Sequence, residues 1–268
     1  MKRKLGINCD CVQGLNPVDA LEILKDVGFD CFFSDTGNLD LATMTALRNK
    51  ADKLGLGYEF VHAPFRDVNS MWEENEKTKP FMDSIIQALD NAEKVGVPQI
   101  ILHASSKWVP PAMTEAGFAR YDELVAYAEK KKVGMAIENL RIFDYYDALI
   151  QRYKDSKYVS FCYDNGHEHC CTPEVDNIQI FADKISCTHL HDNLGKLDNY
   201  LTVDGDLHLL PFDGTFDFTQ MIRRLDKANY QGALTLEVGD TTHPDYQKFT
   251  AEEFIKTSYE RLLKISKL

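Results

Sequence analysis

The chain has 268 residues, 44% of them hydrophobic and 27% charged, which is the balance of an ordinary soluble globular protein. Its formal net charge of −12 at pH 7 disfavours broad electrostatic binding to nucleic acid or to an anionic membrane surface. No apolar run approaches the ~20 residues that span a bilayer, so we expect neither a membrane partner nor a secretory signal. The length fits one α/β barrel and no linker divides it, so we expect a single domain over residues 1–268.

The cysteines indicate a reducing compartment. There are seven, an odd number, and without an export signal they are expected to be free thiols in the cytoplasm. Neither Cys9 and Cys11 nor Cys170 and Cys171 have the two-residue gap of a structural zinc site. We therefore expect buried, unbridged cysteines that act as small hydrophobic residues in a cytoplasmic protein.

Short apolar segments alternate with segments of helical periodicity along the first half of the chain. Asn16, followed by proline, is typical of a helix start, and Gly28 is typical of a helix end. Asp40 and Gly55 bound the next helix in the same way. The elements expected here are strands over residues 4–8, 31–34, 58–61 and 99–102 and helices over 16–28, 40–55 and 80–96.

The second half repeats this alternation, with one weakly patterned helix over residues 175–182. His169, Cys170 and His243 do not follow a strand directly and are assigned to loops. The elements expected here are strands over 134–137, 158–162, 185–190 and 233–236 and helices over 118–128, 146–153, 175–182, 218–225 and 254–265.

Residues that can bind a divalent cation lie at or just beyond the ends of at least six of these strands. Six of the eight histidines are among them, which is an unusual use of histidines if they serve only the core. Imidazoles interleaved with carboxylates at one rim predict metal ligation. The residues are His62, His103, Glu138, Asp164, His167, His189, His191, Asp206, His208 and Glu237.

Eight strands alternating with about eight helices fit either an open sheet or a closed parallel barrel. Only a closed ring brings the carboxyl ends of strands three to eight around one centre. No glycine-rich phosphate-binding run follows the first strand, so no nucleotide cofactor is expected. The sequence therefore predicts a single (β/α)8 TIM barrel with a metal site at the C-terminal ends of the strands.

Motifs along essentially the whole chain resemble those of the xylose isomerase-like barrel superfamily. This superfamily holds sugar isomerases and epimerases, inosose dehydratase and the endonuclease IV type of abasic-site nuclease. The motifs are Val61-His62-Ala63-Pro64, Leu102-His103, Ile137-Glu138-Asn139, Asp164-Asn165-Gly166-His167, His189-Leu190-His191-Asp192-Asn193, Asp206-Leu207-His208 with Gly214 beyond it, and Leu236-Glu237.

The resemblance implies one divalent cation, zinc, manganese or cobalt, held by Glu138, Asp164, His189 and Glu237. In the epimerases the residues matching Glu138 and Glu237 also transfer the proton. A cation that chelates a carbonyl and its neighbouring hydroxyl acidifies the C–H between them and stabilises the enediolate. Two carboxylates on opposite faces can then remove and return the proton.

The remaining matches leave two alternatives open. In the nuclease branch, residues matching His62 and His103 bind a further zinc, and those matching His167, Asp206 and His208 bind another. In many sugar-acting relatives, several of the same residues bind substrate hydroxyls instead. Asp192 is expected to orient an imidazole ring.

The expected mouth of the barrel favours a small substrate. No basic loop suits a bent duplex. Trp108 and Arg141 are predicted to bind substrate, with Arg141 either anchoring a phosphate or carboxylate or pairing with Asp144. Met71-Trp72, Trp108 and Phe143 form either an apolar wall against a sugar or packing at the rim.

These observations predict a cytoplasmic, metal-dependent isomerase or epimerase that acts on a sugar, sugar phosphate or polyol through an enediolate. The alternative is a three-zinc phosphodiesterase resembling endonuclease IV. A third hypothesis is a barrel that binds a sugar or a metal without turnover. Nucleic acid is a disfavoured partner, and a homo-oligomer is left open.

Overall fold

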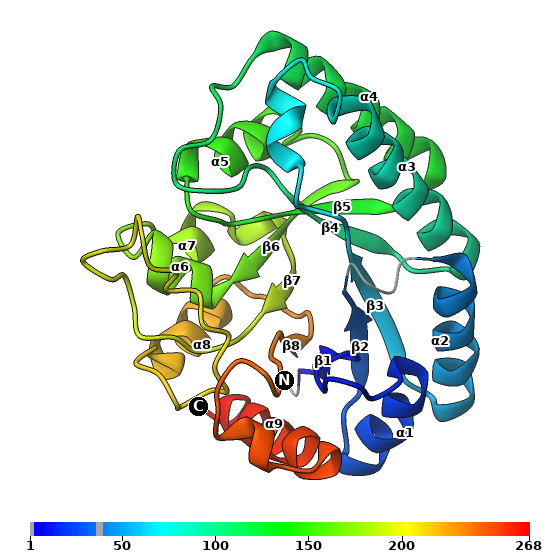
Figure 1. The fold of residues 1–268 in the computed structure, drawn as a ribbon, viewed down its shortest axis with the longest axis vertical. Coiled ribbons are helices and arrows are strands. Elements are labelled where there is room, and N and C mark those ends of the chain that lie inside the picture. The colour runs from blue at the N-terminus through cyan, green and yellow to red at the C-terminus, as the bar shows by residue number, and fades with distance from the viewer. Residues whose placement is uncertain (1–2, 36–39) are drawn as a thin grey trace.

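The computed structural model describes residues 3–35 and 40–268, and its centre is a ring of eight parallel strands (Figure 1). Each strand from β2 to β7 pairs with the strand before it in the sequence, and β8 pairs with β1. The strands are β1 (Leu5–Asn8), β2 (Cys31–Ser34), β3 (Gly57–His62), β4 (Gln99–His103), β5 (Gly134–Glu138), β6 (Val159–Asp164), β7 (Ile185–His189) and β8 (Leu234–Leu236).

The ring closes just beyond the end of β7. Leu190 pairs with Leu236 in a parallel bridge. The backbone N–H of Leu190 donates to Thr235 O at 2.8 Å, and the N–H of Glu237 donates to Leu190 O at 3.0 Å. This closure confirms the predicted TIM barrel.

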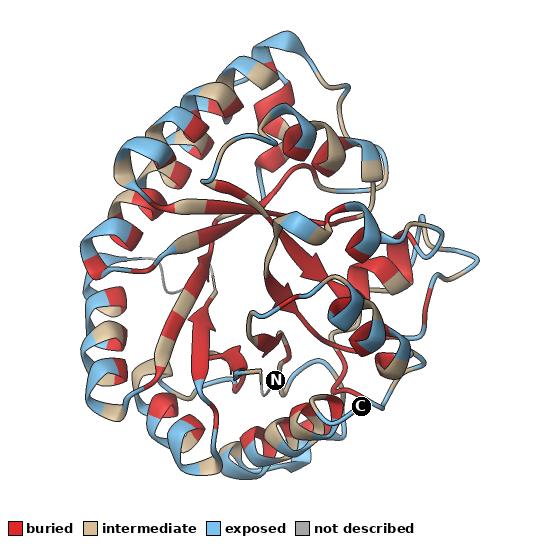
Figure 2. Ribbon diagram, turned by 180° about the vertical axis from the view of Figure 1, so that it is seen from behind, coloured by how far each residue is buried: buried red, intermediate tan, exposed pale blue. Residues whose placement is uncertain are grey.

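Helices surround the strands, and the long helices bury the face turned toward the strands (Figure 2). The predicted caps are confirmed: Asn16 accepts the N–H of Val18 at 2.8 Å, and Gly28 and Gly55 end their helices in the left-handed conformation. The helices are α1 (Pro17–Val27), α2 (Leu41–Leu54), α3 (Thr78–Val95), α4 (Glu115–Lys131), α5 (Phe143–Arg152), α6 (Asn165–Cys171), α7 (Asn177–Ile180), α8 (Phe218–Lys227) and α9 (Ala251–Ile265), with 3-10 turns η2 (Val68–Trp72), η3 (Ala182–Lys184) and η4 (Tyr246–Lys248). None of the helices described is long and apolar enough to cross a membrane.

The segment after β6 differs from the prediction. The helix expected over residues 175–182 is the four-residue α7 followed by the turn η3. The assignment of His169 and Cys170 to a loop is wrong, because both lie in α6. Asp164 starts this helix directly from the strand, since its Oδ1 accepts the backbone N–H of His167 at 2.6 Å.

The inside of the barrel determines where the polar side chains of the strand ends point. Buried residues of five strands fill the interior in one cluster with Phe33 of β2. Because side chains alternate along a strand, the residue two positions later points into the same interior. The interior residues of these five strands are Phe60, Ile101, Ala136, Cys162 and Cys187. The residues two positions after them are, in the same order, His62, His103, Glu138, Asp164 and His189. All seven cysteines are buried and unbridged.

Candidate metal centre

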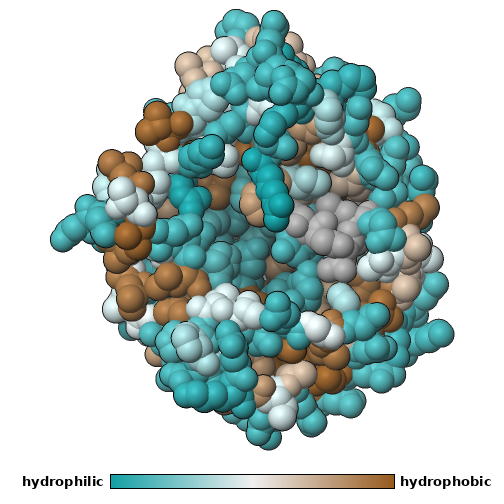
Figure 3. Space-filling view, viewed as in Figure 1, coloured by the Kyte–Doolittle hydropathy of each residue, from teal (hydrophilic) through white to brown (hydrophobic). Residues whose placement is uncertain are grey.

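A cavity of about 340 Å³, lined largely by ionisable residues, opens at the carboxyl ends of the strands. Figure 3 shows the hollow in the middle of this face, with largely hydrophilic residues around it. The cavity is lined by residues of β3, β4 and β5 and of the segments after β6, β7 and β8, including His62, His103, Glu138, His167, Asp206, His208 and Glu237.

A central group consists of Glu138, Asp164, His189 and Glu237. One ligand atom from each of the four residues lies within 4.8 Å of the others. His189 Nδ1 is 2.9 Å from Glu138 Oε1 and 3.3 Å from Glu237 Oε2. The structure therefore brings together, within reach of one cation, the four side chains that the resemblance implied.

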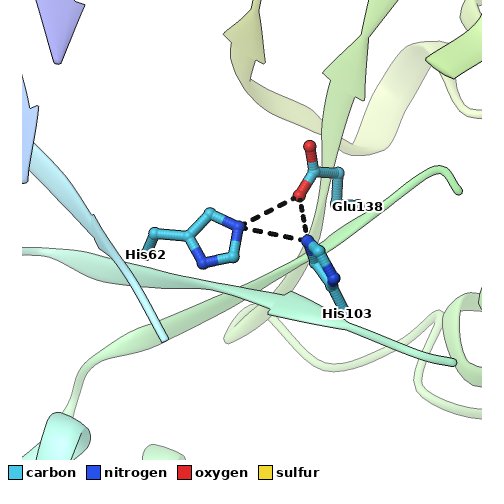
Figure 4. Close-up of side chains that lie close together, drawn as sticks. All are labelled: His62, His103 and Glu138. Carbon is cyan, nitrogen blue, oxygen red and sulfur yellow. Dashed lines mark hydrogen bonds and ion pairs between the residues drawn. The ribbon is translucent and has the colours of Figure 1, made fainter. Parts of the chain in front are cut away.

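A rim group consists of His62, His103 and Glu138 (Figure 4). The two Nε2 atoms of His62 and His103 are 3.1 Å apart, and Glu138 Oε2 lies 3.5 Å and 3.0 Å from them, respectively. Since Glu138 Oε1 faces His189 instead, one carboxylate is shared between the rim group and the central group.

A loop group consists of His167, Asp206 and His208. Asp206 Oδ2 lies 2.9 Å from His167 Nε2, and its Oδ1 lies 3.3 Å from His208 Nε2. His167 Nδ1 is 3.5 Å from Glu138 Oε1, so the loop group borders the central group. The four residues predicted to hold one cation and the five predicted to bind substrate or a further cation thus belong to three adjoining groups.

The donor atoms fit divalent cations. Glu138 Oε2, His167 Nδ1 and Asp206 Oδ1 are buried atoms that lie 3.0 to 3.5 Å from a possible ion-pair partner but complete no hydrogen bond in the described part of the chain. Buried polar atoms of this kind normally have a partner, and a cation satisfies them. Mixed imidazole and carboxylate donors suit zinc, manganese or cobalt.

The groups are held together by strong mutual electrostatics. Burial alone lowers the pKa of His189, but the carboxylates of Glu237 and Glu138 outweigh it and raise the pKa to about 10. Burial also lowers the pKa of His208, but the carboxylate of Asp206 outweighs it and the pKa is raised to about 10. Burial raises the pKa of Glu138, yet the neighbouring imidazoles bring it well below its usual range. Cations binding here would therefore displace protons.

Of the two alternatives for the apolar side chains near the mouth, the structure shows packing for Met71, Trp72 and Phe143. Met71 and Trp72 are fully buried, and the Trp72 indole N–H donates to Ala104 O at 2.8 Å. Phe143 packs against Tyr146 with ring centroids 5.3 Å apart. The reason is that η2 turns the Met71-Trp72 segment toward α4, away from the cavity.

Arg141 lines the cavity, whereas Trp108 is not among the described residues that line it. Arg141 Nη2 donates to both oxygens of Asp204 at 3.0 Å and 3.2 Å, so the alternative pairing with Asp144 is wrong. Trp108 contacts Arg141 and Tyr200. The centroid of its ring is 5.9 Å from Arg141 Cζ and 4.6 Å from the centroid of the Tyr200 ring.

The expectation for Asp192 is also wrong. Its Oδ1 accepts the backbone N–H of Asn193 at 2.9 Å and of Phe216 at 3.1 Å, and its Oδ2 accepts that of Phe212 at 2.9 Å. The carboxylate therefore holds the backbone of the loop before α8, and it accepts no hydrogen bond from an imidazole among residues 3–35 and 40–268.

Two further residues lie near the centre: His191, which the sequence placed among the possible cation ligands without assigning it to a group, and Asp35, to which the sequence gave no role. His191 is fully buried, and its Nε2 lies 3.2 Å and 3.3 Å from the two oxygens of Asp164. Its position two residues after His189 carried the signal, because both side chains point the same way along an extended segment. Asp35 lines the cavity and follows β2 directly, which is the same strand-end signal.

The family comparison matches a sequence model described as xylose isomerase-like TIM barrel over residues 21–264. Among solved structures, a xylose isomerase domain protein from Planctomyces limnophilus is 16% identical, with a TM-score of 0.72 and 99% of this chain and 97% of that chain covered. A structure of an IOLI protein with a zinc atom bound is 18% identical, with a TM-score of 0.75 and 98% of each chain covered. A D-tagatose 3-epimerase-like protein is 21% identical, with a TM-score of 0.68 and 97% and 98% covered. At these identities the likeness concerns the fold.

Sequence relatives include two uncharacterized proteins. Protein y4fM of Sinorhizobium fredii (strain NGR234) is 29% identical over 163 residues, which are 56% of this chain and 50% of that protein. The chain thus spans half the length of this relative. Protein MJ1311 of Methanocaldococcus jannaschii is 22% identical over 224 residues, or 78% of this chain and 73% of that protein.

Proposed function

The chain belongs to the xylose isomerase-like TIM barrel family, and we propose on this basis that it is a divalent-metal-dependent isomerase or epimerase of a small sugar, sugar phosphate or related polyol. Solved structures with the same fold include proteins named D-psicose 3-epimerase and L-ribulose 3-epimerase. The cavity of about 340 Å³ lies within the range of pockets that take small molecules.

The observation that carries the proposal is the placement of Glu138 and Glu237. The two carboxylates approach the same nitrogen, His189 Nδ1, at 2.9 Å and 3.3 Å, from strands that have β6 and β7 between them. A cation held by the central group would supply a Lewis acid that polarises a substrate carbonyl and acidifies the neighbouring C–H.

In this proposal Glu237 and Glu138 move the proton on opposite faces of the substrate carbon. Glu237 is the more accessible of the two, with 19% of its side chain exposed against 1% for Glu138. Glu138 is held by imidazoles on both of its oxygens, which keeps its carboxylate in one orientation. The residues of the rim group and the loop group that do not also belong to the central group bind substrate hydroxyls.

The experiment is solvent-deuterium incorporation into a panel of ketoses by the metal-loaded protein. We expect exchange with the wild type and a loss of about 10²- to 10⁴-fold for Glu237→Gln, because positioned acid-base groups contribute that much. Glu252→Gln, an exposed position on α9, is the control and should exchange as the wild type does. Equal exchange by Glu237→Gln, or none by the wild type across the panel, contradicts the proposal.

A second candidate is a phosphodiesterase that uses three cations. The sharing of Glu138 between two groups and the adjoining loop group favour it, since clustered cations stabilise both oxygens of a phosphoryl displacement. Against it, Arg141 is the single Lys or Arg among the described cavity-lining residues, and it is paired with Asp204. This candidate expects close to three ions per chain and incision of abasic-site DNA. One ion and intact DNA would eliminate it.

A further inference from the structure

We propose that His191 is a positioning residue that fixes Asp164 and His208 relative to each other and so couples the central group to the loop group. The inference rests on the proposed function in one respect, namely that these groups hold divalent cations. His191 stands in the motif His189-Leu190-His191-Asp192-Asn193 but belongs to none of the three groups defined above.

The first contact of His191 is with the central group. Its Nε2 lies 3.2 Å from Asp164 Oδ1 and 3.3 Å from Oδ2, and both side chains are fully buried. The same carboxylate accepts the N–H of His167 at 2.6 Å. Asp164 is therefore held from two sides, which leaves its carboxylate aimed at Glu138 and His189.

The second contact is with the loop group. The rings of His191 and His208 stack with centroids 3.9 Å apart and planes at 9°. His191 Nε2 also lies 3.8 Å from Asp206 Oδ1. His208 needs such support, because it lies on a long segment between β7 and α8 and has a left-handed φ of 46°.

The backbone of His191 is held by two hydrogen bonds, and its ring packs closely against Gly166. Its backbone N–H donates to Asn165 Oδ1 at 2.9 Å, and its carbonyl accepts from Asn165 Nδ2 at 2.8 Å. Gly166 faces the ring so closely that an added Cβ would lie 1.9 Å from His191 Cε1. A ring nitrogen of His191 also lies within 4.8 Å of one possible ligand atom each of His208 and Glu237. Its proximity to both Asp164 oxygens and its stacking favour a bracing role over ligation.

Two substitutions separate the two contacts. His191→Phe keeps a flat ring that can stack on His208 but has no nitrogen for Asp164. His191→Gln keeps an amide nitrogen near the position of Nε2 but has no ring. Partners that orient metal ligands change metal affinity by about 10- to 100-fold when removed.

The experiment is a Co²⁺ titration of the chelator-treated full chain, followed by the visible absorption of the bound ion. We expect His191→Phe to weaken Co²⁺ binding by about 10- to 100-fold. His191→Gln should bind close to wild type but with a changed Co²⁺ spectrum, because His208 has lost its stacking partner. His169→Phe and His169→Gln are matched controls, since His169 lies outside the three groups and contacts Thr215.

Wild-type affinity in His191→Phe, or equal losses in both variants, would overturn the inference. If His191→Phe does not fold, His191→Gln alone decides, and an unchanged spectrum overturns it. A wild type that binds no Co²⁺ refutes the proposed function itself, whereas a wild type that binds with unaffected variants refutes only the role of His191.

Discussion

At the scale of single residues, Gly166 is the position with the least room near the proposed metal centre. An added Cβ would lie 1.9 to 2.4 Å from three atoms of the His191 ring. We expect Gly166→Ala to lower the free energy of unfolding by about 1–3 kcal/mol or more, because overpacking in a rigid environment forces side chains off their rotamers. Urea unfolding measures the change.

A second substitution checks the cause of this loss. In Gly166→Ala with His191→Ala the clash is removed, so the two single losses should not add. Gly205→Ala is the control, because its nearest contact would be an ordinary 3.5 Å. Additive losses would show that the ring of His191 does not limit the space at Gly166.

The histidines of the centre predict a pH dependence for the metal-free protein. The pKa values of His189 and His208 are raised to about 10 in the folded chain, above the ordinary value of 6.5. The folded state therefore binds more protons, and the stability from these pairs is complete below pH ~6.5 and lost as pH rises toward ~10. The melting temperature of the chelator-treated protein should fall over this interval.

Bound cations should remove this dependence, because ligated imidazoles carry no extra proton. Melting of the metal-loaded protein over the same interval is the comparison. Parallel curves for the two forms would contradict the assignment of His189 and His208 to cation-binding groups.

At the scale of elements, an ion pair ties α8 to α6, the helix that carries His167. Arg224 Nη1 donates to Glu168 Oε1 at 2.6 Å and Nη2 to Oε2 at 3.0 Å, with Glu168 buried. Arg224→Met should cost about 3–5 kcal/mol, because it leaves a buried carboxylate without its cation. Denaturant unfolding of this variant against Arg223→Met, an exposed neighbour on the same helix, measures the loss. Equal stability of the two variants would refute the structural role of the pair.

The elements that the sequence predicted are those with a regular hydrophobic period. The strands and the long helices α1 to α4 have such a period because each buries one side or both. The helix α6 has none, since Gly166, His167, Glu168 and Cys170 are all buried and nearly every face of it is packed. Its start was encoded only in the cap formed by Asp164.

The difference between regular elements and irregular segments also explains which residues of the site could be placed from the sequence. Residues at strand ends could be placed because the alternation of side chains fixes which ones face the barrel interior. The orientation of loop residues could not, because it depends on contacts between distant segments. Trp72 turns inward onto α4, and Arg141 pairs with Asp204 across 63 residues.

At the scale of the whole molecule, barrel closure is what makes the centre. Glu138 and Glu237 are 99 residues apart in the numbering (237 − 138), and they meet only because β8 pairs with β1 and Leu190 bridges to Leu236. The closed ring also concentrates carboxylates at one end of a chain whose net charge is −12. Cations at this end would offset part of that charge.

The most direct measurement is the divalent-metal content of the purified full chain after dialysis against zinc, manganese and cobalt, for the wild type and for Asp164→Asn. The account predicts at least one tightly held ion per wild-type chain and a marked loss of affinity in the variant, because Asp164 belongs to the central group alone. A wild type that retains no divalent ion, or a variant that holds it equally well, would contradict the account.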